Sequence, residues 1–314
     1  MSNKIALVFL VCSCFTLSSK SQGLQLDFLF SSGLTYSSEF HGASKLDDST
    51  DFSFSKHQLQ FIVPLKTKIN LDLKNFNLKK MNLSSSQLFL TSKIGFNQSN
   101  VTNGAANSIY KMSLGITGLN AGIRQGIWIY SANIYFDESE ETFNKNIVPN
   151  FRGYGARIKV KSFDFIYFYG AALVVNQGKF YPVPVLGFQK KLAKNLKTRI
   201  VFPIEAKLNY KVNPKLNIDL GANFDGLNTI YREGSVMSDT DASVNYRQLK
   251  PYVALNSKIA KQFKLRLEGG MSVAQQYRVI ENGSSQDLGE SFYVAFSLNF
   301  QFGKSLFGQF VNPQ

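Results

Sequence analysis

Cysteine, histidine and tryptophan are scarce in this sequence. Its 314 residues include two cysteines, two histidines and one tryptophan. Both cysteines, Cys12 and Cys14, lie close to the N-terminus, so the rest of the chain has no thiol. A disulfide framework, a thiolate metal site and a cysteine nucleophile are therefore excluded beyond that point. With only His41 and His57 present, a histidine-based catalytic centre has few possible positions.

Charged residues are also few, and their balance is basic. They make up 18% of the chain, whereas aromatic residues make up 14% and hydrophobic residues 44%. This excludes a disordered chain, which combines low hydrophobicity with few aromatic residues. Lys and Arg number 35 against 21 Asp and Glu, for a net charge of +14. We attribute this basic excess to the turns and the interior of the fold that is predicted below. Nucleic acid is not an expected partner, because the N-terminus predicts export from the cytoplasm.

Residues 1–22 predict a secretory signal peptide. Lys4 precedes an apolar run at 5–17, and small polar residues follow at 18–22. This run is too short to span a bilayer as a helix, which needs about 20 apolar residues. An alternative is a lipoprotein signal in which Cys14 is lipidated. Beyond the signal, the longest apolar run, 165–175, is also shorter than a membrane helix.

The rest of the chain alternates between apolar and polar residues. In the segment 291–302, Phe292, Phe296 and Phe300 belong to one face, and Ser297 belongs to the other. Such alternation at period two predicts strands, and the segment is longer than the usual strand of about five or six residues. Segments of about ten residues with one apolar face are typical of transmembrane β-barrels. A soluble β-sandwich is the alternative, because its strands also alternate.

The prediction is an all-β, antiparallel transmembrane β-barrel of about 14 strands, with twelve strands as the alternative. The barrel is expected at residues 23–302, followed by a C-terminal tail at 303–314. The expected strands are 25–36, 56–65, 86–97, 109–119, 127–136, 153–161, 164–176, 182–190, 196–202, 205–211, 215–225, 247–257, 263–276 and 291–302.

The connecting segments separate by charge. Short basic turns, such as those around Lys194 and Lys261, are expected in the periplasm. Longer acidic segments are expected outside the cell, at 37–54, 137–152, 226–246 and 277–290. In this arrangement both chain termini are periplasmic.

Three short motifs carry a family resemblance. They are FYPVPVLGF at 180–188, RIVFP at 199–203 and LNYKVNPKL at 208–216. In this pattern the chain resembles a family of uncharacterised outer-membrane β-barrel proteins of Gram-negative bacteria, over residues 109–302. The resemblance implies the barrel fold and the outer-membrane location. It implies no activity, cofactor or site residue.

If the apolar faces contact lipid, the polar faces line the lumen. Eight basic residues are then expected inside against three acidic ones, which favours anions. These residues are Lys93, Lys111, Arg157, Lys159, Arg199, Lys207, Lys264 and Arg266, against Asp219, Asp225 and Glu268. The same charges are equally consistent with a plugged interior in which they pair with one another.

The sequence therefore predicts a non-enzymatic outer-membrane barrel, either a narrow porin-like channel or a structural barrel with a basic lumen. No catalytic, metal or cofactor-binding residue is expected, and no cofactor. Outer-membrane lipids, lipopolysaccharide and small anionic solutes are the expected partners, and the sequence names no protein partner. One alternative is an outer-membrane lipid hydrolase or deacylase that uses His57 with Ser53 or Ser55. Another is an accessory barrel of a secretion system.

Overall fold

The computed structural model describes ten segments of the chain. They are residues 32–45, 51–71, 83–101, 107–122, 126–138, 149–162, 164–176, 179–231, 242–279 and 285–302. The expected signal peptide, both cysteines, the start of the first expected strand and the tail at 303–314 lie outside the described residues. No helix in the described segments is long and apolar enough to cross a membrane.

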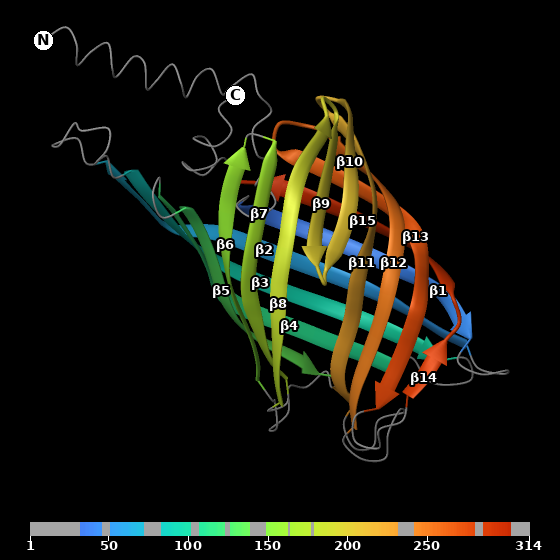
Figure 1. Ribbon diagram of the computed structural model, residues 1–314. Helices are drawn as coiled ribbons and strands as arrows, with labels where there is room; N and C mark the ends of the chain where they lie inside the picture. The colour runs from blue at the N-terminus through green and yellow to red at the C-terminus, as the bar shows by residue number, and fades with distance from the viewer. Residues whose placement is uncertain are drawn as a thin grey trace, which may run out of the picture.

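Strands make up almost all of the described chain (Figure 1). They are β1 (Gly33–Lys45), β2 (Asp51–Leu71), β3 (Leu83–Val101), β4 (Asn107–Gly122), β5 (Gly126–Glu138), β6 (Asn150–Ser162), β7 (Phe165–Asn176), β8 (Lys179–Ala193), β9 (Leu196–Phe202), β10 (Glu205–Asn213), β11 (Leu216–Tyr231), β12 (Ala242–Lys258), β13 (Phe263–Val279), β14 (Ser285–Leu288) and β15 (Ser291–Gln301).

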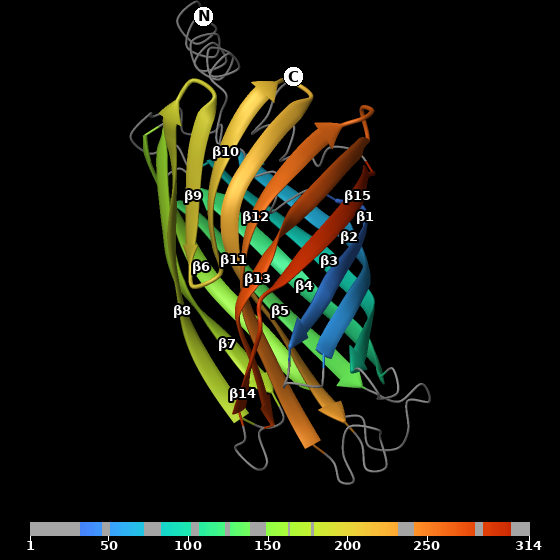
Figure 2. The same cartoon turned by 90° about the vertical axis from the view of Figure 1, so that its right-hand side faces the viewer.

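The strands form one closed antiparallel barrel. Each strand from β1 to β13 pairs with the next along the chain, β13 pairs with β15, and β15 pairs with β1 (Figure 2). β14 and β15 keep one register against β13, since Leu288 is opposite Gln275 and Ser291 is opposite Ser272. They form a single wall strand that is interrupted at residues 289–290. The described wall therefore has fourteen strands, which confirms the expected fold and number, and the twelve-strand and sandwich alternatives are wrong.

The two ends of the barrel differ. Short turns at 194–195 and 214–215 join strands at one end, where Phe302 also donates a backbone hydrogen bond to Ser32. We call this the turn end, and the opposite end the loop end. The strands run further toward the loop end than the sequence predicts: β1 and β2 fill most of the expected loop 37–54. Polar residues of this region are strand residues whose side chains face the interior of the barrel. Glu39, for example, pairs with Lys56 on β2 and with Ala295 on β15.

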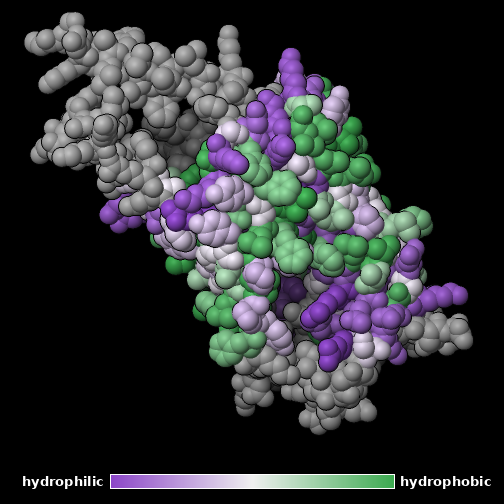
Figure 3. Space-filling model, in the orientation of Figure 1, coloured by the Kyte–Doolittle hydropathy of each residue, from purple (hydrophilic) through white to green (hydrophobic). Residues whose placement is uncertain are grey.

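The outer face of the wall is apolar. On β15, Phe292 and Val294 are 73% and 60% exposed, whereas Tyr293 between them is 1% exposed. Figure 3 shows hydrophobic residues spread over the side of the barrel that faces the viewer. A large exposed apolar surface on a closed barrel is the lipid-contacting surface of a transmembrane β-barrel. The expected face assignment of the last strand is therefore confirmed.

The inner face, in contrast, is not uniformly polar. Toward the turn end it carries an apolar cluster, the turn-end cluster, formed by Phe89, Leu119, Ile129, Ile158 and Ile166. Toward the loop end it carries the loop-end cluster, formed by Phe52, Phe54, Ile109, Val244, Tyr246 and Leu288. An inward side chain in an open pore would contact water, but Leu119 and Ile109 are both 0% exposed. Apolar side chains from distant strands therefore meet inside the lumen near the loop end, and apolar side chains of the adjacent strands β3 to β7 cover its wall near the turn end.

The wall is incomplete beside β9 and β10. β8 pairs with β9 only over Leu186 to Ala193, and β11 pairs with β10 only over Leu216 to Asn223. Both longer strands continue beyond the turn at 203–204, which ends the short hairpin near mid-wall (Figure 1). In the described segments, no strand pairing joins β8 to β11 below this turn. Near the loop end β11 instead meets β5, at Ile230 and Glu138.

Candidate functional site

A polar chamber of about 1260 Å³ lies in the lumen between the two apolar clusters. The order of residues along β4 shows its position. Leu119 belongs to the turn-end cluster, Thr117, Ser113 and Lys111 line the chamber, and Ile109 belongs to the loop-end cluster. The chamber is therefore the part of the lumen that the apolar side chains leave open.

An ion-pair network crosses the chamber. Lys56 on β2 places its Nζ 2.5 Å from Asp225 on β11. Lys250 on β12 lies 2.8 Å from Asp225 and 2.8 Å from Glu39 on β1. Glu39 also contacts the ring of His41, and the Lys250 side chain is only 5% exposed. Because the nearly buried ammonium of Lys250 needs carboxylate partners, the network ties β1 and β2 to β11 and β12 inside the barrel.

A second network lies toward the turn end. Arg266 on β13 contacts Asp219 at 2.8 Å and Glu268 at 2.6 Å. Glu205 on β10 contacts Arg199, and Lys207 lies 3.3 Å from Glu205 and 4.0 Å from Asp219. Two tyrosine hydroxyls donate to these carboxylates, Tyr252 to Glu205 at 3.2 Å and Tyr293 to Glu268 at 2.7 Å. This network joins strands β9 to β13 and β15 from the inside.

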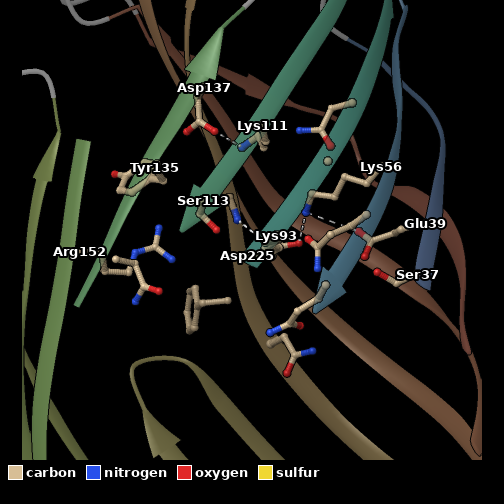
Figure 4. Close-up of a pocket in the computed structure, with 18 of the residues that line it drawn as sticks. Ser37, Glu39, Lys56, Lys93, Lys111, Ser113, Tyr135, Asp137, Arg152 and Asp225 are labelled. Atoms are coloured by element: carbon tan, nitrogen blue, oxygen red, sulfur yellow. Dashed lines mark hydrogen bonds and ion pairs between the residues drawn. The ribbon is translucent and has the colours of Figure 1, made fainter. Parts of the chain in front are cut away.

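A third group of charges faces the open part of the chamber. Lys93 on β3, Lys111 on β4 and Arg152 on β6 point toward the same space (Figure 4). Asp137 on β5 lies 3.4 Å from Lys111, and the guanidinium of Arg152 lies over the ring of Tyr135 at 5.1 Å. Arg152 and Lys93 are exposed, and both line the chamber.

The chamber has a basic excess. Among the described residues that line it, seven are cationic and four are carboxylates. The cationic ones are Lys56, Lys93, Lys111, Arg152, Arg247, Lys250 and Arg266, and the carboxylates are Glu39, Asp137, Asp225 and Glu268. Such a lining attracts anions, as basic rings do in pores.

The structure brings together most of the residues expected in the lumen. Five of them line the chamber, namely Lys93, Lys111, Asp225, Arg266 and Glu268. Arg199, Lys207 and Asp219 belong to the second network, which reaches the chamber through Arg266. Lys264 lies two residues before Arg266 and so on the same face of β13, opposite Asn299, but it does not line the chamber.

Arg157 and Lys159 are placed differently from the expectation. Arg157 is opposite Trp128, and its guanidinium lies 5.3 Å from the centre of that exposed indole. Lys159 is opposite Tyr167, which is also exposed. Their neighbour Ile158 packs in the turn-end cluster instead of facing lipid. Both basic residues therefore lie on the outer face. The turn-end half of β6 has the apolar residues Ala156 and Ile158 on its inner face, so its inner and outer residues are the reverse of those expected.

Several chamber residues were missing from the expectation. Glu39 and Asp137 were expected in acidic outer loops, but both lie in strands, where neighbouring strands pair with them. Arg152 was likewise expected in a loop. The sequence does indicate the position of Lys250, since Lys250, Tyr252 and Ala254 alternate with apolar residues along an expected strand. The alternation at 247–257 would have placed Lys250 inside.

The outer face carries one serine–histidine contact. Ser38 Oγ lies 2.8 Å from His57 Nδ1 and donates to the Tyr36 hydroxyl at 2.8 Å. Phe40 and Phe96 pack against the ring of His57. Neither Ser53 nor Ser55 makes this contact, and Ser38 is only 2% exposed. A catalytic serine needs an accessible hydroxyl and an oriented base, and the burial of Ser38 does not fit the first requirement.

No metal site is found in the described segments. They contain no group of three or more His, Cys, Asp or Glu side chains that could hold a metal ion. The carboxylates of the chamber each contact a basic side chain, for example Glu39 with Lys250 and Asp137 with Lys111.

Comparison with known families identifies the chain. Residues 18–306 match the model of a family described as "Domain of unknown function (DUF6268)". The chain belongs to this family. The match spans the whole barrel, so the resemblance to a family of uncharacterised barrels is confirmed. No curated protein matches the sequence of this DUF6268 member.

Solved structures similar to this family member are remote. The COG4313 outer membrane channel from Pseudomonas putida F1 has 12% identity and a TM-score of 0.38, with 86% of this chain and 96% of that chain covered. The translocator domain of autotransporter NalP from Neisseria meningitidis has 8% identity and a TM-score of 0.34, with 95% and 96% covered.

Proposed function

We propose that the protein is a porin-like barrel of the outer membrane that admits small anionic solutes into its lumenal chamber. The observation that carries this proposal is the chamber lining, with seven cationic side chains against four carboxylates in about 1260 Å³. Lys93, Lys111 and Arg152 are the residues that would meet an entering anion, because they face the open part of the chamber.

In this proposal the barrel rests in a closed state. The loop-end cluster joins distant strands across the lumen, since Phe54 on β2 contacts Tyr246 on β12 with ring centres 5.2 Å apart. The ion pair between Lys56 and Asp225 also crosses the lumen. Passage along the barrel axis therefore requires these side chains to move, and the conductance of the unmodified barrel should be low.

The proposed location follows from export and from the outer face. A cleaved signal peptide at 1–22 would send the chain through the inner membrane, and the apolar outer face would contact outer-membrane lipids and lipopolysaccharide. We propose no catalytic activity and no cofactor. A lipid hydrolase centred on His57 is not favoured, because Ser38 is almost fully buried.

The proposal is tested by ion selectivity in planar bilayers. The background is a barrel opened by Phe54→Ala and Tyr246→Ala, so that the lumen conducts. The reversal potential of this background should indicate anion preference, and Lys93→Gln with Lys111→Gln and Arg152→Gln should shift it toward cations. The matched control, Arg157→Gln with Lys159→Gln, changes basic residues of the outer face and should leave it unchanged.

Two outcomes would overturn the proposal. An opened barrel without anion preference would remove the anion-channel function and leave a structural barrel with a plugged interior. An equal shift of the reversal potential in the control variant, Arg157→Gln with Lys159→Gln, would show that charge on the outer face sets the selectivity. The chamber residues would then have no special role.

A further inference from the structure

We propose that the chamber takes up amphipathic anions from the membrane through a side opening between β8 and β11. The ligand class is an alkyl chain with a carboxylate or phosphate head group. The inference rests on the anion-binding chamber proposed above, and it adds the entrance and the chemical class of the ligand.

The opening arises from the short hairpin of β9 and β10. Below the turn at 203–204, β8 continues over 179–185 and β11 over 224–231, without strand pairing between them in the described segments. The backbone N–H of Phe224 donates a hydrogen bond to the carbonyl of Ile204, one residue beyond the last strand pair between the hairpin and β11, Glu205 with Asn223. We call the space between β8 and β11 beyond this contact the window.

The window is continuous with the chamber. Tyr181 and Val183 of β8 and Asp225 of β11 line the chamber from the two sides of the window. Figure 3 shows a hollow in the wall below the tip of the β9–β10 hairpin, with hydrophilic residues visible inside it. A route therefore leads from the side of the barrel to the charged interior.

The rim of the window is apolar. Phe180 is 70% exposed, Phe224 is 64% exposed, and Phe202 and Ile204 at the hairpin tip are 60% and 52% exposed. These side chains surround an entrance to a chamber whose interior is basic. An apolar rim in front of cationic residues fits a ligand that has both an alkyl chain and an anionic head.

The depth of the window places it beside lipid. β9 has seven residues, which at about 3.4 Å per residue and a tilt of about 40° reach roughly 18 Å from the turn end. The apolar band of such barrels is about 25 Å tall, so the window begins within it. Strand edges without partners are tolerated at this depth only where they line a cavity or are buried in protein. The chamber supplies that cavity.

The axial route is filled while the lateral route is open. At the loop end, Phe54 contacts Tyr246 across the lumen, and β11 meets β5. Lys93, Lys111 and Arg152 lie on the side of the chamber formed by β3 to β6. The head group would reach these cations while its chain lies between Phe180 and Phe224.

The test uses photolabelling of the full-length mature barrel in phosphatidylcholine nanodiscs. The probe is dodecanoate with a diazirine at the end of its chain, and mass spectrometry locates the labelled residues. We expect saturable labelling at 180–183 and 224–226. Excess dodecanoate or dodecyl phosphate should compete at least tenfold better than acetate or methyl dodecanoate. Phosphatidylglycerol in the nanodisc should compete only if the chamber also accepts the phosphate of a membrane lipid.

Two sets of variants separate the head-group site from the window. Lys93→Gln with Lys111→Gln and Arg152→Gln should reduce saturable labelling at least tenfold, while Arg157→Gln with Lys159→Gln should not. Val183→Trp should obstruct the window and reduce labelling at 224–226, whereas Val253→Trp, on the outer face of β12, should not. Heat-modifiable migration in gels verifies folding, and Val183→Phe replaces Val183→Trp if that variant does not fold.

The outcomes distinguish this inference from the proposed function. Labelling spread evenly over the outer face, or unchanged by Val183→Trp and Val183→Phe, would overturn the window. If the opened barrel still prefers anions in that case, the chamber function stands without a lateral entrance. If the opened barrel shows no anion preference while dodecanoate labels the window saturably, the porin-like function fails and a lipid-anion site remains.

Discussion

Lys56 Nζ lies 2.5 Å from the carboxylate of Asp225, although the two residues are 169 positions apart and their strands, β2 and β11, are not neighbours in the sheet. Lys250 Nζ also lies 2.8 Å from the carboxylate of Asp225. The carboxylate therefore links two distant parts of the wall beside the window. Asn223 is the last residue of β11 that pairs with the hairpin, and Asp225 follows it by two positions. The ion pairs of Asp225 therefore lie at the edge of the window.

The first prediction concerns this link. Asp225→Asn should destabilise the barrel by about 3 kcal/mol, because breaking a buried pair leaves uncompensated charge, and the partial exposure of Asp225 keeps the cost at the lower end of the usual range. Urea unfolding in lipid vesicles measures it. The control is Asp164→Asn, which removes an exposed pair with Lys191 at 3.8 Å and should cost less than about 1 kcal/mol. Equal costs for the two variants would refute a structural role for the lumenal network.

The second prediction concerns the loop-end cluster. Phe54→Ala together with Tyr246→Ala should raise the single-channel conductance several-fold, because these rings come from strands that are not neighbours and meet inside the lumen. Each truncation should also cost about 3 kcal/mol of stability. Phe292→Ala is the control, since Phe292 is 73% exposed on the outer face. If both the double variant and the control keep the low conductance of the unmodified barrel, the cluster is not the axial barrier.

The third prediction compares two adjacent residues of β15. Phe296 lies on the outer face at 38% exposure, and Ser297 is opposite Arg266, whose side chain belongs to the network inside the barrel. Phe296→Arg should cost roughly 2–4 kcal/mol if it lies near the membrane midplane, whereas Ser297→Arg meets water and polar groups. Heat-modifiable migration should therefore be lost, or shifted to lower temperature, mainly for Phe296→Arg. The opposite order would invert the assignment of faces.

The fourth prediction concerns orientation in the membrane. Ser285 at the loop end and Lys261 at the turn end are both exposed. Because short basic turns are expected in the periplasm, Ser285→Cys should react with a membrane-impermeant thiol reagent on intact cells and Lys261→Cys should not. Both should react after the outer membrane is permeabilised. Reaction of Lys261→Cys alone on intact cells would reverse the proposed topology.

The sequence by itself determined the strands and the barrel. Alternation at 291–302 and similar segments identifies the wall strands because a strand places successive side chains on opposite faces, and this local rule needs no knowledge of the partners. The same rule predicts Lys93, Lys111, Asp225 and Arg266 on the inner faces of their strands, and all four line the chamber.

Only the tertiary structure decided which faces are filled, which charges meet and where the wall opens. Ile158 packs inside the barrel and moves Arg157 to the outer face, because an apolar residue is equally stable against lipid and against an apolar cluster. The contact of Lys56 with Asp225 depends on the curvature of the whole sheet, which no local pattern encodes. The window, likewise, depends on the length of β9 relative to β8 and β11, and a strand's unpaired edge becomes visible only when its neighbours are in place.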